Sequence, residues 1–110
     1  MSVISEERRL KTYINVFHCK PENQKALSAA IRKETEDIVR NMPGFVSANV
    51  HCSVDGTRVT NYAQWSDLDA FQQHIRSEAG RALIVEMHKY ADDVDVHVYD
   101  VDWTLAGEGV

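Results

Sequence analysis

The dipeptide Asp55-Gly56 is the feature of this sequence that most constrains its fold. It separates two segments, 45–54 and 57–65, in which apolar residues recur at every second position. Asp-Gly between two such segments is a strong signal for a β-hairpin closed by a two-residue turn. Because the turn fixes the register, the expected cross-strand pairs are Val54 with Thr57, Cys52 with Val59, Val50 with Asn61, Ala48 with Ala63, and Val46 with Trp65.

Helical patterns flank this hairpin on both sides. Pro21 predicts the start of a helix that ends at Pro43-Gly44. Its expected buried stripe is Leu27, Ala30, Ile31, Ile38 and Met42. After the hairpin, Ser66 is expected to cap a short helix, with Asp69 three residues on, as in a capping box. Segment 78–91 predicts a further helix.

Strands are predicted at the two ends of this pattern, over 10–18 and 94–103. The resulting order, βαββαβ, is that of the ferredoxin-like α+β fold with an antiparallel four-stranded sheet. Such a sheet has helices on one face, and both terminal strands are expected to be apolar on both faces. The open face then needs a cover, and a symmetric homodimer is the simplest one. We expect a single domain over 1–110, with a core of about 10–103 and a flexible tail over 104–110.

Charge and composition exclude several functional classes. The chain has 110 residues and a formal net charge of −5, which argues against nucleic acid and anionic membrane surfaces as partners. No apolar run approaches the roughly 20 residues of a membrane span, and residues 1–9 lack the apolar region of a signal peptide, so a cytoplasmic location is expected. Cys19 and Cys52 are expected as reduced thiols. Phosphate-binding glycine motifs and metal-ligand spacings are absent, so no cofactor and no metal are expected.

A polar cluster is predicted on the helix-facing side of the sheet. Asn61 lies among apolar residues of that face, and the topology makes the first and third strands neighbours, which places Asn15 beside Asn61. Trp65 lies on the same face. Few polar groups within an apolar pocket are typical of a small-molecule site. The alternative is that the two amides bond each other or the backbone and the indole fills the core. The expected pocket lining is Tyr13, Phe17, Val50, Cys52, Ala63, Phe71 and Ile84.

The histidines form no metal-binding motif. His74 and Glu78 lie four residues apart, which makes a weak metal pair. His88, on the last predicted helix, is the candidate acid or base if it reaches the pocket. The alternative for His88 is a half-exposed helical residue without a chemical role.

Taken together, several motifs resemble the antibiotic biosynthesis monooxygenase family, over roughly residues 12–103. They are Met-Pro-Gly-Phe-Val-Ser-Ala at 42–48, Asp-Gly-Thr at 55–57, Asn-Tyr-Ala-Gln-Trp at 61–65 and Asp-Ala-Phe at 69–71. The resemblance implies a dimeric α+β barrel. For the branch that acts on aromatic polyketides, it also implies a cofactor-independent monooxygenase. Such an enzyme oxidises an anthrone- or hydroquinone-like substrate to a quinone with O2.

The resemblance also assigns roles to the polar cluster. Asn61 and Trp65 would bond the substrate carbonyl and stabilise its developing oxyanion. Asn15 would orient the substrate or a peroxy intermediate. Two positions depart from some relatives, which have Tyr where Phe71 stands, and Arg near His88. His88 is then the expected base.

Two alternatives stay open at this point. One is a non-catalytic dimeric module that binds a small aromatic ligand. The other, ranked lower, is the haem-degrading branch, which shares the fold and the first-strand Asn. That branch expects a Trp near Gln73 and an axial His near Leu83, and neither is present.

Overall fold

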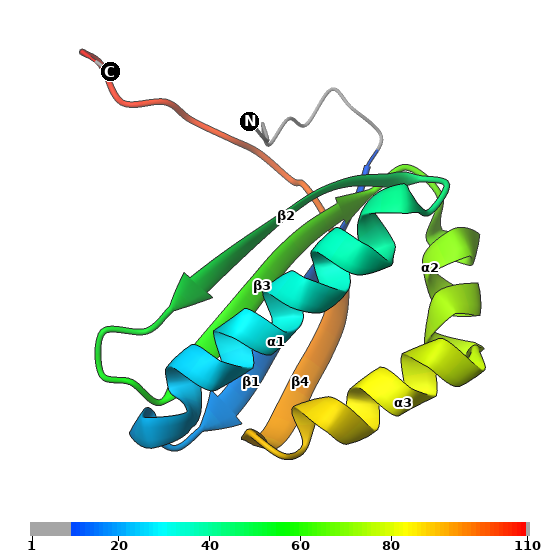
Figure 1. The fold of residues 1–110 in the computed structure, drawn as a ribbon. Coiled ribbons are helices and arrows are strands. Elements are labelled where there is room, and N and C mark those ends of the chain that lie inside the picture. Colours follow the sequence, from blue (N-terminus) through cyan, green and yellow to red (C-terminus); the bar gives the residue numbers. More distant parts are fainter. Residues whose placement is uncertain (1–9, 110) are drawn as a thin grey trace.

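The chain forms one antiparallel sheet with helices on one face (Figure 1). The computed structural model describes residues 10–109, apart from the Leu68 side chain, so the expectations for residues 1–9 and for Val110 lie outside it. In chain order the elements are β1 (Lys11–Cys19), the 3-10 turn η1 (Pro21–Asn23), α1 (Gln24–Asp37), the 3-10 turn η2 (Val39–Asn41), β2 (Phe45–Cys52), β3 (Arg58–Trp65), α2 (Leu68–Arg76), α3 (Glu78–Met87) and β4 (Ala91–Asp100).

The sheet order is β2-β3-β1-β4, and each neighbouring pair is antiparallel. The predicted ferredoxin-like α+β fold, with the first and third strands adjacent, is therefore confirmed. Within the described residues, no helix is both long and apolar enough to cross a membrane.

The hairpin has the predicted register but a longer loop. Val50 lies opposite Asn61, and Cys52 lies opposite Val59, as predicted. The two-residue turn is wrong: the Ser53 N–H donates to the Arg58 carbonyl, and residues 54–57 form the loop. The Asp55 carboxylate draws this wider loop together by accepting hydrogen bonds from its neighbours at positions 53 and 57. The loop adds one residue to each side of the turn, so the register is unchanged.

A bulge changes the pairing at the other end of the hairpin. Trp65 is predicted opposite Val46, but Phe45 takes that place, and the register shifts between Phe45 and Ser47. A bulge inserts one extra residue in one strand. As a result, the Phe45 ring packs edge-on against Trp65, with ring centroids 5.3 Å apart.

The first helix is shorter than predicted. Leu27 and Ile31 are buried beneath α1, as expected from their spacing. Ile38, however, is 42% exposed and ends the helix with φ −123° and ψ −63°. The chain then makes the turn η2 instead of continuing as helix to Met42.

The segments after the hairpin also differ in detail. Asp67, not Ser66, caps α2 by accepting hydrogen bonds from the amides of Asp69 and Ala70. The Ser66 hydroxyl instead donates to the Gly44 carbonyl. Helix α3 ends at Met87 and β4 begins at Ala91, so the last strand starts and ends three residues earlier than predicted.

The last strand is apolar on one face only, contrary to the prediction. Val94 and Val96 lie opposite Phe17 and Asn15, so they face the helices. The alternate positions, Asp95, His97 and Tyr99, belong to the open face. Beyond β4, residues 101–109 have no regular structure, and Figure 1 shows this segment running away from the sheet.

Gly56 is the loop position whose backbone requires glycine. Its φ is +82°, and an added Cβ would lie 3.1 Å from the Cβ of Pro21. We expect Gly56→Ala to lower the free energy of unfolding by about 1–2 kcal/mol, measured by urea denaturation. The control is Gly109→Ala, which has φ +87° but no atom within 4 Å and lies in the tail. Equal losses in both variants would contradict this account of the loop.

Asp55 should make the stability of the loop depend on pH. The hydrogen bonds from the Thr57 hydroxyl, the Thr57 amide and the Ser53 hydroxyl lower the pKa of Asp55 to about 2, from its ordinary value of 3.8. Because folding favours the carboxylate, its stabilisation is present above pH 4 and is lost as the pH falls from about 4 to 2.

We therefore expect Asp55→Asn to be less stable than wild type at pH 6, and the difference to shrink on acidification to pH 2. Thermal melts at a series of pH values measure it. Asp102→Asn, at an exposed position beyond β4, is the control. A stability difference for Asp55→Asn that is constant from pH 6 to pH 2 would show that the charge of this carboxylate is unimportant.

Candidate active site

A cavity of about 350 Å³ lies between the helix-facing side of the sheet and the helices. All four strands supply one wall, and α1, η2, α2 and α3 supply the other. Eight of the residues predicted from the sequence line it: Asn15, Phe17, Asn61, Ala63, Trp65, Phe71, Ile84 and His88.

Three polar side chains meet the cavity from the sheet. Asn15 on β1 lies directly opposite Asn61 on β3, and Trp65 lies four residues further along β3 on the same face. The Oδ1 atoms of both asparagines and Nε1 of Trp65 are buried, with no hydrogen-bond partner among the described residues. The alternative in which the two amides bond each other is therefore wrong. An unpaired buried polar group costs about 1–3 kcal/mol, so this arrangement is costly unless a bound molecule supplies partners.

Aromatic packing fixes the indole of this cluster. The rings of Phe45 and Phe71 lie 5.3 Å and 5.0 Å from Trp65, both edge to face. Trp65 itself is 1% exposed. The indole N–H therefore has a fixed direction at the cavity wall, as preorganised donors require.

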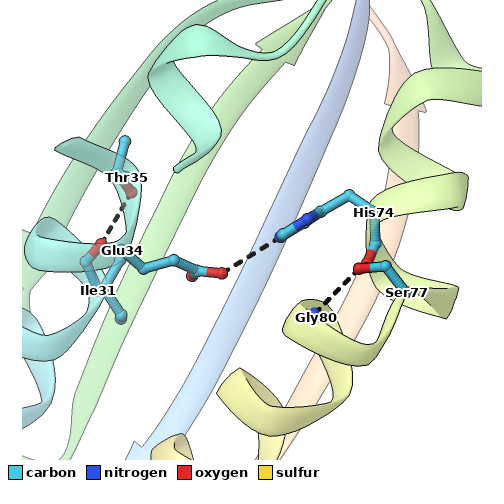
Figure 2. A network of polar contacts seen from close by, with 6 residues as sticks. All are labelled: Ile31, Glu34, Thr35, His74, Ser77 and Gly80. Atoms are coloured by element: carbon cyan, nitrogen blue, oxygen red, sulfur yellow. Dashed lines mark hydrogen bonds and ion pairs between the residues drawn. The ribbon is translucent and has the colours of Figure 1, made fainter. Parts of the chain in front are cut away.

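A carboxylate–imidazole pair lines the cavity on its helical side. Glu34 on α1 and His74 on α2 point toward each other (Figure 2), with Oε1 and Nε2 3.2 Å apart. Their side chains are only 11% and 8% exposed. Burial raises the pKa of Glu34, and the hydrogen bond to His74 partly opposes that rise.

This pair was not predicted from the sequence, although one signal was present. Glu34 is three residues after Ile31 and seven after Leu27, so it lies on the buried stripe of α1. A charged residue on an apolar stripe indicates a buried partner. The partner of His74 is therefore Glu34 and not Glu78. Among positions 10–109, no group of three or more His, Cys, Asp or Glu residues could hold a metal ion.

The cavity opens between α3 and β4. Ile84, Val94 and Val96 line it and are 43%, 37% and 45% exposed. His88 stands at this mouth, where its Nδ1 is 2.7 Å from the Ile84 carbonyl at the end of α3. This bond uses one ring nitrogen for capping the helix. His88 thus lies on the cavity, as predicted, but at its exposed end.

Three predicted lining residues lie elsewhere. Tyr13 is buried against Phe71, with ring centroids 3.8 Å apart, and burial raises the pKa of its phenol. Val50 packs against the core cluster around Leu27. Cys52 ends β2 and is exposed. All three share the correct face of the sheet. Tyr13 and Val50 lie opposite the cavity residues Ala63 and Asn61, but their side chains pack into the hydrophobic clusters beside the cavity.

The lining suits a largely apolar molecule with an oxygen substituent. The apolar side chains of both walls would contact its rings, and the polar groups of β1 and β3 would contact its oxygen. The Glu34–His74 pair adds a group that can accept or hold a proton.

Known proteins have similar sequences or the same fold. The family described as antibiotic biosynthesis monooxygenase matches residues 12–85. Tetracenomycin-F1 monooxygenase of Streptomyces glaucescens is 48% identical over 75 residues, which cover 67% of each chain.

Two solved structures from Streptomyces have the same fold. The monooxygenase from the ActVA-Orf6 gene of Streptomyces coelicolor, in complex with the ligand nanaomycin D, has a TM-score of 0.77 at 23% identity and covers 93% of this chain and 96% of its own. SnoaB of Streptomyces nogalater, a cofactor-independent oxygenase, has a TM-score of 0.72 at 20% identity and covers 90% and 99%. The matched span and the identity to the Streptomyces glaucescens enzyme together show that this chain belongs to the antibiotic biosynthesis monooxygenase family.

Proposed function

We propose that the chain is a cofactor-independent monooxygenase that oxidises an anthrone- or hydroquinone-like aromatic polyketide to a quinone. In the anthrone case, O2 converts the ring CH2 to C=O and the second oxygen atom leaves as water. The substrate supplies the electrons: loss of a proton gives an electron-rich anion, which reacts directly with O2. The protein then has to bind, deprotonate and orient the substrate.

The unpartnered polar cluster is the observation that carries this proposal. Trp65 presents an unpartnered N–H donor at the wall of a largely apolar cavity, and Asn61 presents beside it an amide whose buried Oδ1 has no partner. With its NH2 group turned to the substrate, Asn61 would be the second donor. Donors fixed in such a place stabilise negative charge that develops on a carbonyl oxygen more than they stabilise the neutral carbonyl. Asn15, directly opposite Asn61, would orient the ring or a peroxy group.

Relatives support the class of substrate. The curated relative at 48% identity acts, by its name, on tetracenomycin F1, and a structure of the same fold holds nanaomycin D. In this chain the cavity of about 350 Å³ is at the lower end of the range for small-molecule sites, which fits a compact ring system.

Removing the donors should slow turnover without unfolding the protein. We expect Asn61→Ala to lower kcat about 10²–10³-fold, because an oxyanion donor is lost. Trp65→Phe, which keeps an aromatic ring but lacks the N–H, should cause a smaller loss. The control Asn41→Ala removes an exposed amide from η2, away from the cavity. Wild-type rates in folded Asn61→Ala and Trp65→Phe would contradict the proposed roles.

The direct test is oxygen consumption by metal-stripped, cofactor-free protein with dithranol, a simple anthrone, followed at the quinone absorbance. Turnover above the spontaneous rate, and its loss in Asn61→Ala, would support the oxygenase. Saturable quenching of tryptophan fluorescence without turnover would instead indicate a module that binds a small aromatic ligand.

We also propose that the chain functions as a homodimer whose open sheet faces pack together. Ile14 and Val16 form an apolar centre on this face, between strands whose own residues there are largely polar. Trp103 and Leu105, in the segment after β4, are 71% and 86% exposed. A second copy would bury both sets of side chains, since a two-fold axis brings the same patch together twice.

The mass in solution tests this dimer. Light scattering after size-exclusion chromatography should give twice 12.5 kDa for wild type. Val16→Lys places a charge in the centre of the open face and should shift the mass to that of a monomer. Val54→Lys, on the fully exposed hairpin loop, should leave the dimer intact. A wild-type monomer, or a dimer that tolerates Val16→Lys, would contradict the proposed interface.

A further inference from the structure

The Glu34–His74 pair is a buried titratable group that the polar cluster of the sheet does not use. It connects α1 to α2 across 40 positions of sequence, and both residues line the cavity that holds Asn15, Asn61 and Trp65. A purely structural tie between two helices does not have to face a ligand cavity. Its position therefore gives it access to whatever the cavity binds.

The backbone around His74 is held by three contacts at the junction of α2 and α3. The Ser77 amide and hydroxyl both donate to the His74 carbonyl, at 3.1 Å and 2.6 Å, and the same hydroxyl accepts from the Gly80 amide (Figure 2). Gly80 permits this close approach, because an added Cβ would clash with the His74 carbonyl. The imidazole is thus carried by a rigid junction, and Glu34 fixes its ring from the opposite side.

We propose that His74 is the general base of the reaction and that Glu34 positions it, an inference that rests on the proposed function. When the proton of the neutral imidazole lies on Nε2, it is donated to Glu34, and Nδ1 keeps a free lone pair. Nδ1 then takes a proton from an acidic C–H or phenolic O–H of the bound substrate. The electron pair of that bond stays on the substrate as the anion, stabilised at its oxygen by Asn61 and Trp65. The carboxylate of Glu34 stabilises the imidazolium that forms.

The other titratable residues on the cavity are less suited to this role. His88 and Asp93 line it, but both are exposed, and each has another contact. His88 bonds the end of α3, and Asp93 lies 3.6 Å from His18. The pair on α1 and α2 is the buried one, where water competes least with proton transfer.

Binding of dithranol under nitrogen tests the base without any turnover. Wild-type protein should convert bound dithranol to its anion, seen as a new absorption band at pH 7, and His74→Gln should reduce the ionised fraction at least tenfold while dithranol still binds. His51→Gln, on an exposed position of β2, is the control and should behave as wild type. Dithranol that stays neutral with wild-type protein, or ionises equally with His74→Gln, overturns the proposal.

A second variant keeps the test usable if His74→Gln does not fold. His74→Gln leaves the Glu34 carboxylate buried without its partner, which destabilises proteins. Glu34→Gln/His74→Gln replaces the pair with two amides that can bond each other, and this variant should also bind dithranol without ionising it. An anion that persists in the folded double variant overturns the proposal as well.

Admission of O2 to the same samples separates this inference from the proposed function. We expect kcat to fall about 10²–10⁴-fold in His74→Gln, with KM changed little. An anion that forms but consumes no oxygen would mean that the oxygenase is wrong and the base assignment stands. If oxygen is consumed and the anion forms equally well without His74, the oxygenase stands and the base assignment is wrong.

Discussion

The pairing of β1 with β3 is the constraint on which the rest of the site depends. It places Asn15 directly opposite Asn61 on the face that the helices cover. Two amides in that place need partners, and neither the sheet nor the described helices supply them. Because side chains alternate along a strand, a slip of one residue would send both amides to the open face. The register therefore determines whether the helix-facing side of the sheet has a polar cluster.

Much of this register could be predicted from the sequence, because it follows from local signals. Asp55-Gly56 gave the correct pairing of Val50 with Asn61 even though the loop is longer than a two-residue turn. The predicted turn type was wrong, but the register is unchanged because the loop has one extra residue on each side. The bulge near Phe45 was not predictable in this way, because it adds a residue to one strand only and no turn residue indicates where.

The helical side of the site was harder to predict. The hydrophobic stripe of α1 identifies Leu27 and Ile31 as buried, but it does not reveal what Glu34 meets on the same side. Its partner, His74, lies on a different helix, and its place depends on the packing of α2 against α3. Sequence spacing indicated only Glu78, four residues after His74, as a weak metal pair, and Glu78 is not the partner. Contacts between helices depend on tertiary packing, which local periodicity does not encode.

The two halves of the site have different electrostatic requirements. In the proposed reaction, the sheet would offer uncharged donors, which stabilise an anion without making the empty cavity strongly charged. The helices bring the buried side chains of Glu34 and His74 together. Burial raises the pKa of Glu34, and the hydrogen bond from His74 opposes that rise. A single buried charge in their place would be far more costly. If an incoming proton is taken up by the imidazole, the pair becomes a carboxylate beside an imidazolium, and the substrate carries the matching negative charge at Asn61 and Trp65. Because the side chains between the two halves are largely apolar, charges there are screened less than they would be in water.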